Sequence, residues 1–401
     1  MATLKERAAN SEDIAAILLD RTIRHTAAAD SIGETSETAV RRYRTAAGWT
    51  PADVPAEFPE APETPGLASY DELLDKVGNL EDSNRRLYKQ ASDAKQKGEA
   101  MIDAVYKAAR DAAQFVGHTK AVPPVRDRRS KPEEVALWHL TDWQGGKKTI
   151  SYGLDVMDAR IEQFVEKAVI ITDVMRSDHP VRHGVVLLTG DMVEGVSIFP
   201  GQVWELDGTL FEQMFRVADR IEWTVRQALS IYETVDVICE WGNHGRLGKK
   251  GDGLKASDNV DRMVYEIVRT RLMGESRIKN FQLSGDWYQH FTVGNYSAMA
   301  IHGDEIKGFG GNIPAYGILR KVNSWGSGVI PYFTDCYIGH YHQNMQLTLA
   351  NGGSVFMSGS TESDSEYARE FVAATGKPSQ RINFINPERG RVTYEAKVWL
   401  D

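Results

Sequence analysis

The sequence predicts an α/β protein in which two β-sheets form a sandwich flanked by helices, preceded by a small all-α domain and a coiled-coil-like helix. Three observations lead to this prediction. Five apolar runs end in polar side chains beside glycine, and roughly forty to sixty residues separate them, which leaves room for crossover connections. Helical periodicity fills the intervals after the first three runs, over Val156–Met175, Leu210–Glu233 and Asn259–Leu272. From Phe281 onward the pattern changes to short alternating stretches, which indicate strands of a second sheet.

Residues 1–49 are expected to form the all-α domain. Ser11–Asp20 combines a cap residue, an acidic first turn and apolar residues at helical spacing, so it predicts a short helix. A second helix over Ala27–Ile32, a turn at Gly33 and a third helix should follow. The order is similar to a helix-turn-helix, in which Val40 would anchor the third helix, although the spacing from Gly33 to Val40 is one residue too long.

The helix-turn-helix resemblance implies DNA contacts from the third helix. The residues that would supply groove and phosphate contacts are Ser36, Glu37, Thr38, Arg41, Arg42 and Arg44. The alternative is an ordinary three-helix module whose arginines are only solvated.

A proline-rich linker is expected over residues 50–68, and a coiled-coil-like helix over residues 69–117. Leu73, Leu80 and Leu87 recur every seven residues, and Asn84 falls at a core position that fixes a parallel two-stranded register. This pattern predicts a homodimer through residues 70–100. A helix that packs on its own domain is the alternative. Residues 118–132 are rich in lysine and arginine, which indicates a solvated basic hinge able to touch phosphates.

The catalytic domain is expected over residues 133–401, organised around Val237–Arg246 (VICEWGNHGR). Here an apolar run stops at Gly-Asn-His-Gly, so Asn243 and His244 should lie at the carboxyl end of a buried strand, where open α/β sheets bind ligands. Four other runs end in the same way: Leu137–Gly146, Val185–Gly195, Ala298–Glu305 and Cys336–His342.

In order and composition these five stretches resemble the motifs of the calcineurin-like metallophosphoesterase superfamily, whose pattern is D-x-H, G-D-x-x, G-N-H, an isolated histidine and G-H-x-H. The resemblance implies a two-sheet sandwich and a dinuclear metal-dependent phosphoesterase. One ion would be held by Asp142, Gln144, Asp191 and His342, and the other by Asp191, Asn243, His302 and His340. His244 would then be free to act as the general acid.

This sequence departs from the superfamily at Gln144, where the pattern has histidine. A neutral carboxamide oxygen is a harder ligand than imidazole, so we expect Mn²⁺ or Mg²⁺ in preference to Zn²⁺, with Mn²⁺ first; Fe²⁺ also stays open.

The expected substrate is DNA, although the net charge of −9 requires any contact with nucleic acid to come from local patches. Basic residues follow the first and third motifs, and they would meet the phosphate backbone: Lys147, Lys148, Arg246, Lys249 and Lys250. The functional analogy is to the double-strand-break repair nucleases of the superfamily, acting as exo- or endonucleases. One alternative is a phosphatase or cyclic-nucleotide phosphodiesterase for small substrates; another is a non-catalytic DNA-binding protein.

The two cysteines, Cys239 and Cys336, lie inside predicted strands and are expected to be core thiols in a reducing compartment. The sequence has no signal-like apolar segment at its start and no apolar run of about eighteen residues. A cytoplasmic protein without a membrane partner is therefore expected.

Overall fold

The structure is a computed structural model, and the chain divides into two compact units, Met1–Lys89 and Gln90–Asp401. In the second unit it describes residues 121–196, 198–199, 202–247, 258–283, 285–307, 313–363 and 377–401. In the first it describes residues 4, 8, 10–20, 28–29, 31–32, 37–48, 82, 85–86 and 89.

A six-stranded sheet with the order β11-β10-β1-β2-β3-β4 forms the centre of the larger unit. Its four parallel strands are β1 (Val135–Leu140), β2 (His183–Thr189), β3 (Thr234–Glu240) and β4 (Ile278–Leu283). The helices that connect them are α6 (Leu154–Arg176), α7 (Leu210–Ile231) and α8 (Val260–Arg271). The three predicted crossover helices are therefore confirmed to within a few residues.

The second sheet has the order β5-β6-β7-β9-β8. Its strands are β5 (Gln289–Val293), β6 (Tyr296–Ile301), β7 (Asp335–Ile338), β8 (Met345–Thr348) and β9 (Ser354–Met357). Helix α9 (Ala315–Gly326), which the sequence did not predict, packs Ile318, Val322 and Trp325 against this sheet. The two-sheet α/β sandwich is thus confirmed.

The last two strands belong to the first sheet, which contradicts the prediction that all strands after Phe281 form the second. Strand β10 (Ser379–Asn386) pairs antiparallel with β1, and β11 (Arg391–Trp399) forms the edge. Gln380 of β10 also accepts from Thr141 N at 2.8 Å and donates to Thr141 O at 3.0 Å. Alternation reveals a strand but not its partner, because both sheets need the same apolar inner face.

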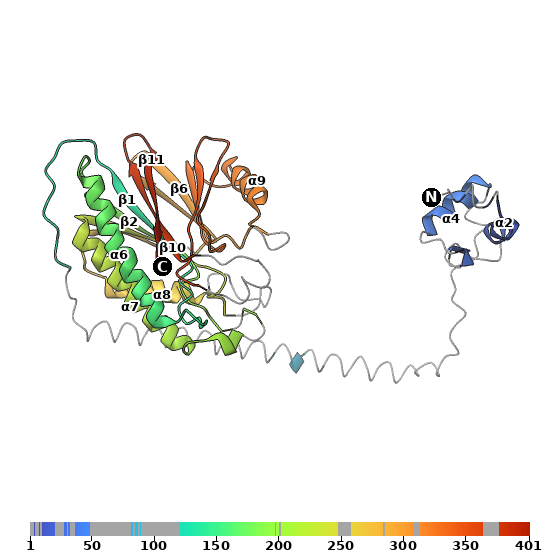
Figure 1. Ribbon diagram of the computed structural model, residues 1–401, viewed down its shortest axis with the longest axis horizontal. Coiled ribbons are helices and arrows are strands. Elements are labelled where there is room, and N and C mark those ends of the chain that lie inside the picture. The colour runs from blue at the N-terminus through green and yellow to red at the C-terminus, as the bar shows by residue number, and fades with distance from the viewer. Residues whose placement is uncertain are drawn as a thin grey trace. The chain divides into compact units, whose positions relative to one another are not determined.

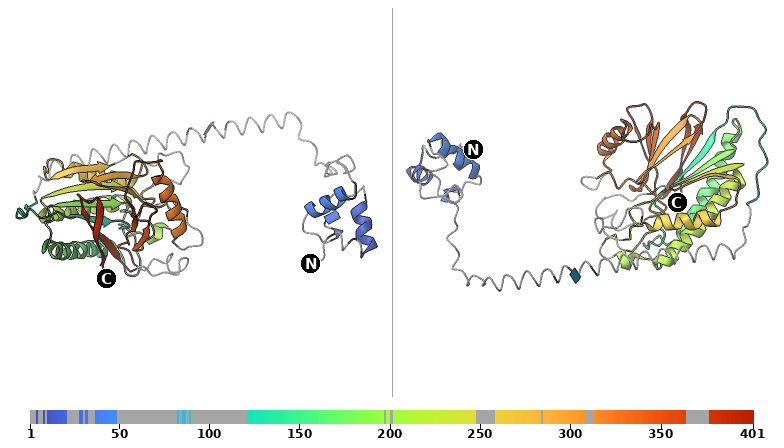
Figure 2. Two further views of the ribbon diagram at one scale, coloured as in Figure 1. Left: turned by 90° about the horizontal axis from the view of Figure 1, so that it is seen from above. Right: turned by 180° about the vertical axis from the view of Figure 1, so that it is seen from behind.

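The side chains of the first sheet pack in two directions, because successive strand residues point to opposite faces. Trp138 and Leu140 of β1 pack with the helices α6, α7 and α8, whereas Leu137 joins the core between the two sheets. Figures 1 and 2 show the resulting layers, with α6, α7 and α8 on one side of the sandwich and α9 on the other. All six residues of β1 are buried, as expected for a strand covered on both faces.

Two helices of the first unit are described, α2 (Glu12–Leu19) and α4 (Glu37–Ala46). Ser11 caps α2 as predicted, with its side chain accepting from Ile14 N. Val40 is buried in a small apolar core with Leu18, Ala28, Ala29 and Ile32. Helical structure at these positions agrees with the predicted all-α module, and DNA binding by it stays a prediction.

Arg44 does not lie on the surface, which contradicts its predicted role in DNA contact. It is fully buried, and its guanidinium donates to Leu18 O at 2.7 Å, Asp20 O at 3.2 Å and Ile17 O at 3.3 Å. These carbonyls end helix α2, which has no basic residue in its last turn. Arg41, Arg42 and Thr38 are exposed on α4, whereas the Ser36 contact lies outside the described residues, as does the side chain of Glu37.

The linker at residues 50–68 lies outside the described residues, and of the predicted coiled coil only Asp82, Arg85, Arg86 and Lys89 are described, all helical and exposed. The homodimer therefore stays a prediction. Residues 121–132 of the predicted hinge form no helix or strand. Arg129 there is not free for phosphate, because it binds both Asp127 oxygens and donates to Arg176 O at 2.7 Å.

Both cysteines are free and buried, which agrees with core thiols. Within the described part of the chain, no helix is both long and apolar enough to span a bilayer.

Candidate metal centre

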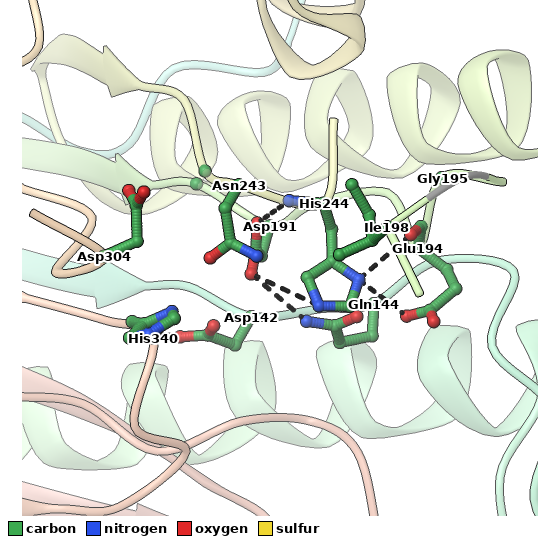
Figure 3. A network of polar contacts seen from close by, with 12 residues as sticks. Asp142, Gln144, Asp191, Glu194, Gly195, Ile198, Asn243, His244, Asp304 and His340 are labelled. Carbon is green, nitrogen blue, oxygen red and sulfur yellow. Dashed lines mark hydrogen bonds and ion pairs between the residues drawn. The ribbon is translucent and has the colours of Figure 1, made fainter. Parts of the chain in front are cut away.

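The polar residues predicted from the five motifs come together beyond the ends of their strands. Figure 3 shows six of them close to one another: Asp142, Gln144, Asp191, Asn243, His244 and His340. Each lies just beyond a strand: β1 is followed by Asp142 and Gln144, β2 by Asp191, β3 by Asn243 and His244, β6 by His302, and β7 by His340 and His342. The two sheets are joined here, because His340 N after β7 donates to Asp142 Oδ2 at 2.9 Å and His302 Nδ1 after β6 lies 2.8 Å from Thr189 O of β2.

The backbone at this edge is held in an unusual conformation. In the described part of the chain, five residues other than glycine have a positive φ: Asp142, Gln144, Asp191, His340 and His342. Every one is a predicted ligand. Each left-handed residue of this kind costs on the order of 1–3 kcal/mol and persists where the surrounding structure enforces it, typically at functional sites. The backbone conformations that orient these side chains therefore lower the stability of the fold.

One cluster of ligand atoms is centred on His302, which is fully buried. Its Nδ1 lies 2.8 Å from Thr189 O, and because a carbonyl only accepts, Nδ1 carries the proton. In the neutral ring the Nε2 lone pair then points to Asp191 Oδ2 at 3.0 Å, Asn243 Oδ1 at 3.1 Å and His340 Nδ1 at 3.2 Å. The ligand atoms of Asp191, His302 and His340 all lie within 4.8 Å of one another.

The electrostatics of this cluster favour a positive charge. Burial lowers the pKa of His302, but the nearby Asp191 and Asp142 carboxylates outweigh it and raise that pKa well above its ordinary value. The pKa of His340 falls to about 4 because of burial and the neighbouring His302. The carboxylates that hold a second proton on His302 would equally attract a metal ion, which would replace the proton on Nε2. His340 is already neutral, as a metal ligand must be.

A second cluster joins Asp142, Gln144 and His342 to the same Asp191. Gln144 Nε2 is 3.4 Å from Asp191 Oδ2 and 3.5 Å from His342 Nε2, and His342 Nε2 is 3.3 Å from Asp142 Oδ1. Asp142 Oδ1 and Gln144 Oε1 are buried and make no hydrogen bond among the described residues. Buried oxygens without a donor are costly, and a divalent cation would satisfy them. The donor set therefore fits two hard cations that share Asp191.

His244 lies beside this centre, with both ring nitrogens close to acidic residues. Nδ1 is 3.0 Å from Glu194 O and 3.2 Å from Glu194 Oε2, while Nε2 is 4.0 Å from Asp191 Oδ2 (Figure 3). Burial lowers the pKa of His244, but Asp191 and Glu194 outweigh it and raise the pKa to about 9. The ring is therefore protonated at neutral pH and can donate a proton.

Asp261, which the sequence did not single out, holds the second and third motifs together. Its Oδ1 accepts from Met192 N and Val193 N, both at 3.1 Å, and its Oδ2 accepts from Gly242 N at 2.9 Å. Burial and the nearby Asp191 raise its pKa to about 6. In the sequence it resembles any acidic residue in the first turn of a helix, so only its contacts reveal this role.

We expect Asp261→Asn to destabilise the fold and to weaken metal binding together. One of the two carboxamide atoms is itself a donor, so at least one backbone N–H would lose its acceptor, at a cost of roughly 1–3 kcal/mol. Denaturant unfolding and Mn²⁺ titration measure the two effects. Asp219→Asn is the matched control, because Asp219 is an exposed helix residue that pairs with Arg271. Unchanged stability and metal affinity in Asp261→Asn would show that the hydrogen bonds that the Asp261 carboxylate accepts from the second and third motifs are dispensable.

The basic residues predicted to contact DNA are in different situations. Lys147 is only 6% exposed and pairs with Glu362 at 3.3 Å, which contradicts a role in contacting a DNA backbone. Lys148 is exposed and lies 3.5 Å from Asp207. Arg246 pairs with Asp304 next to His302 and stays partly exposed. Lys249 and Lys250 lie outside the described residues.

Comparisons with known proteins give weak likenesses. No protein-family model matches the sequence, and no curated protein matches it. Among solved structures, a dimetal phosphatase from Danio rerio aligns at 10% identity and TM-score 0.32, covering 68% of this chain and 100% of that one. An archaeal phosphodiesterase aligns at 14% identity and TM-score 0.31, covering 66% of this chain and 99% of that one. Vps29 from Entamoeba histolytica, in complex with Zn²⁺, aligns at 12% identity and TM-score 0.30, covering 67% of this chain and 99% of that one. Scores of this size establish neither a family nor an activity.

Proposed function

We propose that this protein is a metal-dependent phosphoesterase of the calcineurin-like kind that cleaves phosphodiester bonds, with DNA as its substrate. The observation that carries the proposal is the convergence of ligand atoms from Asp191, Asn243, His302 and His340, with His244 Nε2 beside them at 4.0 Å from Asp191 Oδ2. Oxygen and nitrogen donors so arranged hold divalent cations, and Mn²⁺ suits the oxygen-rich set that includes Gln144.

The residues have separate tasks in this proposal. Asp142, Gln144, Asp191 and His342 would hold one cation, and Asp191, Asn243, His302 and His340 the other. Two such cations lower the pKa of a water molecule and offset the charge that builds up on the phosphate oxygens during attack. Asp191 lies between both clusters, so its position fixes their spacing.

His244 would protonate the leaving oxygen. The Glu194 carbonyl and carboxylate hold Nδ1, so Nε2 is the nitrogen that faces the metal ligands and can give up its proton to the substrate. Glu194 is itself fixed, because Gln202 Nε2 donates to its carboxylate and to its carbonyl, both at 2.9 Å. A general acid so oriented contributes about 10²- to 10⁴-fold to the rate.

Two features favour DNA over small phosphate esters. Arg246 follows the third motif and lies beside His302 through its pair with Asp304, where its guanidinium can meet a phosphate next to the scissile one. On α4, the exposed Arg41 and Arg42 with Thr38 form a basic polar face of the kind that contacts DNA backbones. A cytoplasmic enzyme that acts as a homodimer is part of the same proposal.

Incubation of the full chain with Mn²⁺ and end-labelled linear DNA tests the proposed function. We expect metal-dependent shortening of the DNA, faster than release of phosphate from nitrophenyl phosphate. Hydrolysis of cyclic nucleotides or monoesters without cleavage of DNA would favour the small-substrate phosphatase or phosphodiesterase. DNA binding without any hydrolysis would favour a non-catalytic DNA-binding protein. The Asp191→Asn variant serves as the control for contaminating nucleases.

A further inference from the structure

A chain of charged contacts extends from the metal centre into the protein behind His342. His342 Nε2 faces Asp142 Oδ1 at 3.3 Å, and on the other side of the ring Nδ1 is 3.1 Å from Glu362 Oε2. The second oxygen of Glu362 is 3.3 Å from Lys147 Nζ. The chain therefore runs from lysine to carboxylate to imidazole to the edge of the first ligand cluster.

The two charged residues behind His342 are both buried. Glu362 is 5% exposed and Lys147 is 6% exposed. Their backbones are also fixed, since Glu362 N donates to Ser360 Oγ at 2.8 Å and Lys147 N donates to Gln144 O at 2.9 Å. Burying two charges costs several kcal/mol each, and the attraction between them seldom yields a net gain in stability. A role in the site explains their burial better than a role in stability.

The carboxylate of Glu362 determines which nitrogen of the His342 ring is protonated and how the ring is oriented. Because an ionised carboxylate only accepts, Nδ1 must carry a proton, so Nε2, which faces Asp142 in the first cluster, is the nitrogen that would bind the ion. A carboxylate behind a histidine ligand also makes the imidazole a stronger base and fixes the ring's orientation. Lys147 holds the far oxygen of Glu362, so the carboxylate cannot turn away from His342.

The presence of Gln144 in the first cluster makes the positioning of His342 by Glu362 and Lys147 important for metal binding. The Gln144 side chain is an uncharged carboxamide whose Nε2 lies 3.5 Å from His342 Nε2, and it stands where an imidazole would bind a cation more strongly. The first cluster therefore depends on its remaining imidazole, His342, more than a cluster with two imidazoles would.

We propose that the buried pair Lys147–Glu362 positions His342 and strengthens it as a ligand, so that the first metal position holds its ion despite Gln144. Neither residue touches the substrate or the ion; both act through His342. The inference depends on the proposed metal centre, but it does not depend on which phosphate ester the centre cleaves.

Metal titration of the full chain tests the proposal without any measurement of activity. Isothermal titration with Mn²⁺, together with the spin-coupled signal that a pair of Mn²⁺ ions gives in electron paramagnetic resonance, should show two ions per chain in the native protein. In Glu362→Gln we expect one of the two affinities to fall by about 10- to 100-fold, with loss of the coupled signal, while the other is unchanged.

Two variants separate positioning from a general loss of structure. Glu395→Gln removes a carboxylate that pairs with Arg381 on β10 and β11, and it should leave both affinities unchanged. Gln144→His in the Glu362→Gln background should restore the weakened affinity, because it adds the missing imidazole. If Glu362→Gln does not fold, the double variant Lys147→Met/Glu362→Gln avoids an unpaired buried charge and should show the same selective loss.

Several results would overturn the proposal. They are a native protein that binds a single Mn²⁺, a Glu362→Gln or double variant that keeps both affinities, or a Gln144→His substitution that restores nothing. A native protein that binds two ions but cleaves no phosphodiester would instead contradict the proposed function and leave this inference standing.

Discussion

Replacement of His244 by alanine is expected to slow cleavage of an ordinary phosphodiester by about 10²- to 10⁴-fold while metal binding is retained. The reason is the separation of the ring from the ligand clusters. Its Nδ1 is held by Glu194, and its Nε2 is 4.0 Å from Asp191 Oδ2. Steady-state cleavage of DNA and Mn²⁺ titration measure the two quantities.

An activated ester distinguishes a proton donor from a residue that only binds phosphate. A nitrophenolate leaves well without a proton, so the same variant should lose much less activity on a nitrophenyl phosphodiester than on DNA. His290→Ala is the matched control, because His290 lies on β5 and contacts Tyr332 O, outside the centre. Equal losses on both esters, or loss of metal, would show that His244 is not the general acid.

Replacement of Asp191 by asparagine is expected to abolish metal-dependent hydrolysis, with a larger loss of metal affinity than the roughly 10- to 100-fold typical of residues behind the ligands. Asp191 contacts both clusters, through Gln144 on one side and His302 on the other. Its Oδ1 also accepts from His244 N at 2.7 Å, a bond that the asparagine oxygen can still accept. The fold should therefore survive while both ions bind poorly.

Mn²⁺ titration, hydrolysis and thermal unfolding should be measured on the same preparation of Asp191→Asn. Asp158→Asn is a suitable control, since Asp158 is a buried carboxylate that pairs with Arg220 between α6 and α7. Substantial hydrolysis by Asp191→Asn with Mn²⁺ bound would exclude the bridging role.

The sequence predicted the parts of this structure in which local pattern and chemistry agree. Buried parallel strands have unbroken apolar runs. The ends of β1, β2, β3, β6 and β7 could therefore be located from the points at which apolar runs stop at polar residues and glycine. Parallel strands of one sheet end at the same edge, which groups the polar residues within each sheet. The resemblance to the metallophosphoesterase motifs then joined the two groups before any coordinates were known. The crossover helices were predicted for the same reason, since their apolar periodicity is long and regular.

The parts that the sequence did not predict depend on partners that are distant in the chain. An arginine on an amphipathic helix is usually solvated, yet Arg44 reaches the end of α2, twenty-six residues earlier. Lys147 follows a metal motif and was expected to meet phosphate, but a carboxylate more than two hundred residues later holds it inside. The strain at five ligand residues and the clamp at Asp261 are likewise properties of the assembled edge.

The position of β10 next to β1 has a consequence for how the protein matures during synthesis. Strand β1 and its Thr141 emerge from the ribosome well before Gln380, which binds both backbone groups of Thr141 and is made about 240 residues later. At typical elongation rates of roughly 5–20 residues per second, this interval lasts on the order of ten seconds or more. Until then the strand that leads to Asp142 lacks its second neighbour. The nascent chain therefore completes the edge that carries the candidate metal centre only after Gln380 has been made.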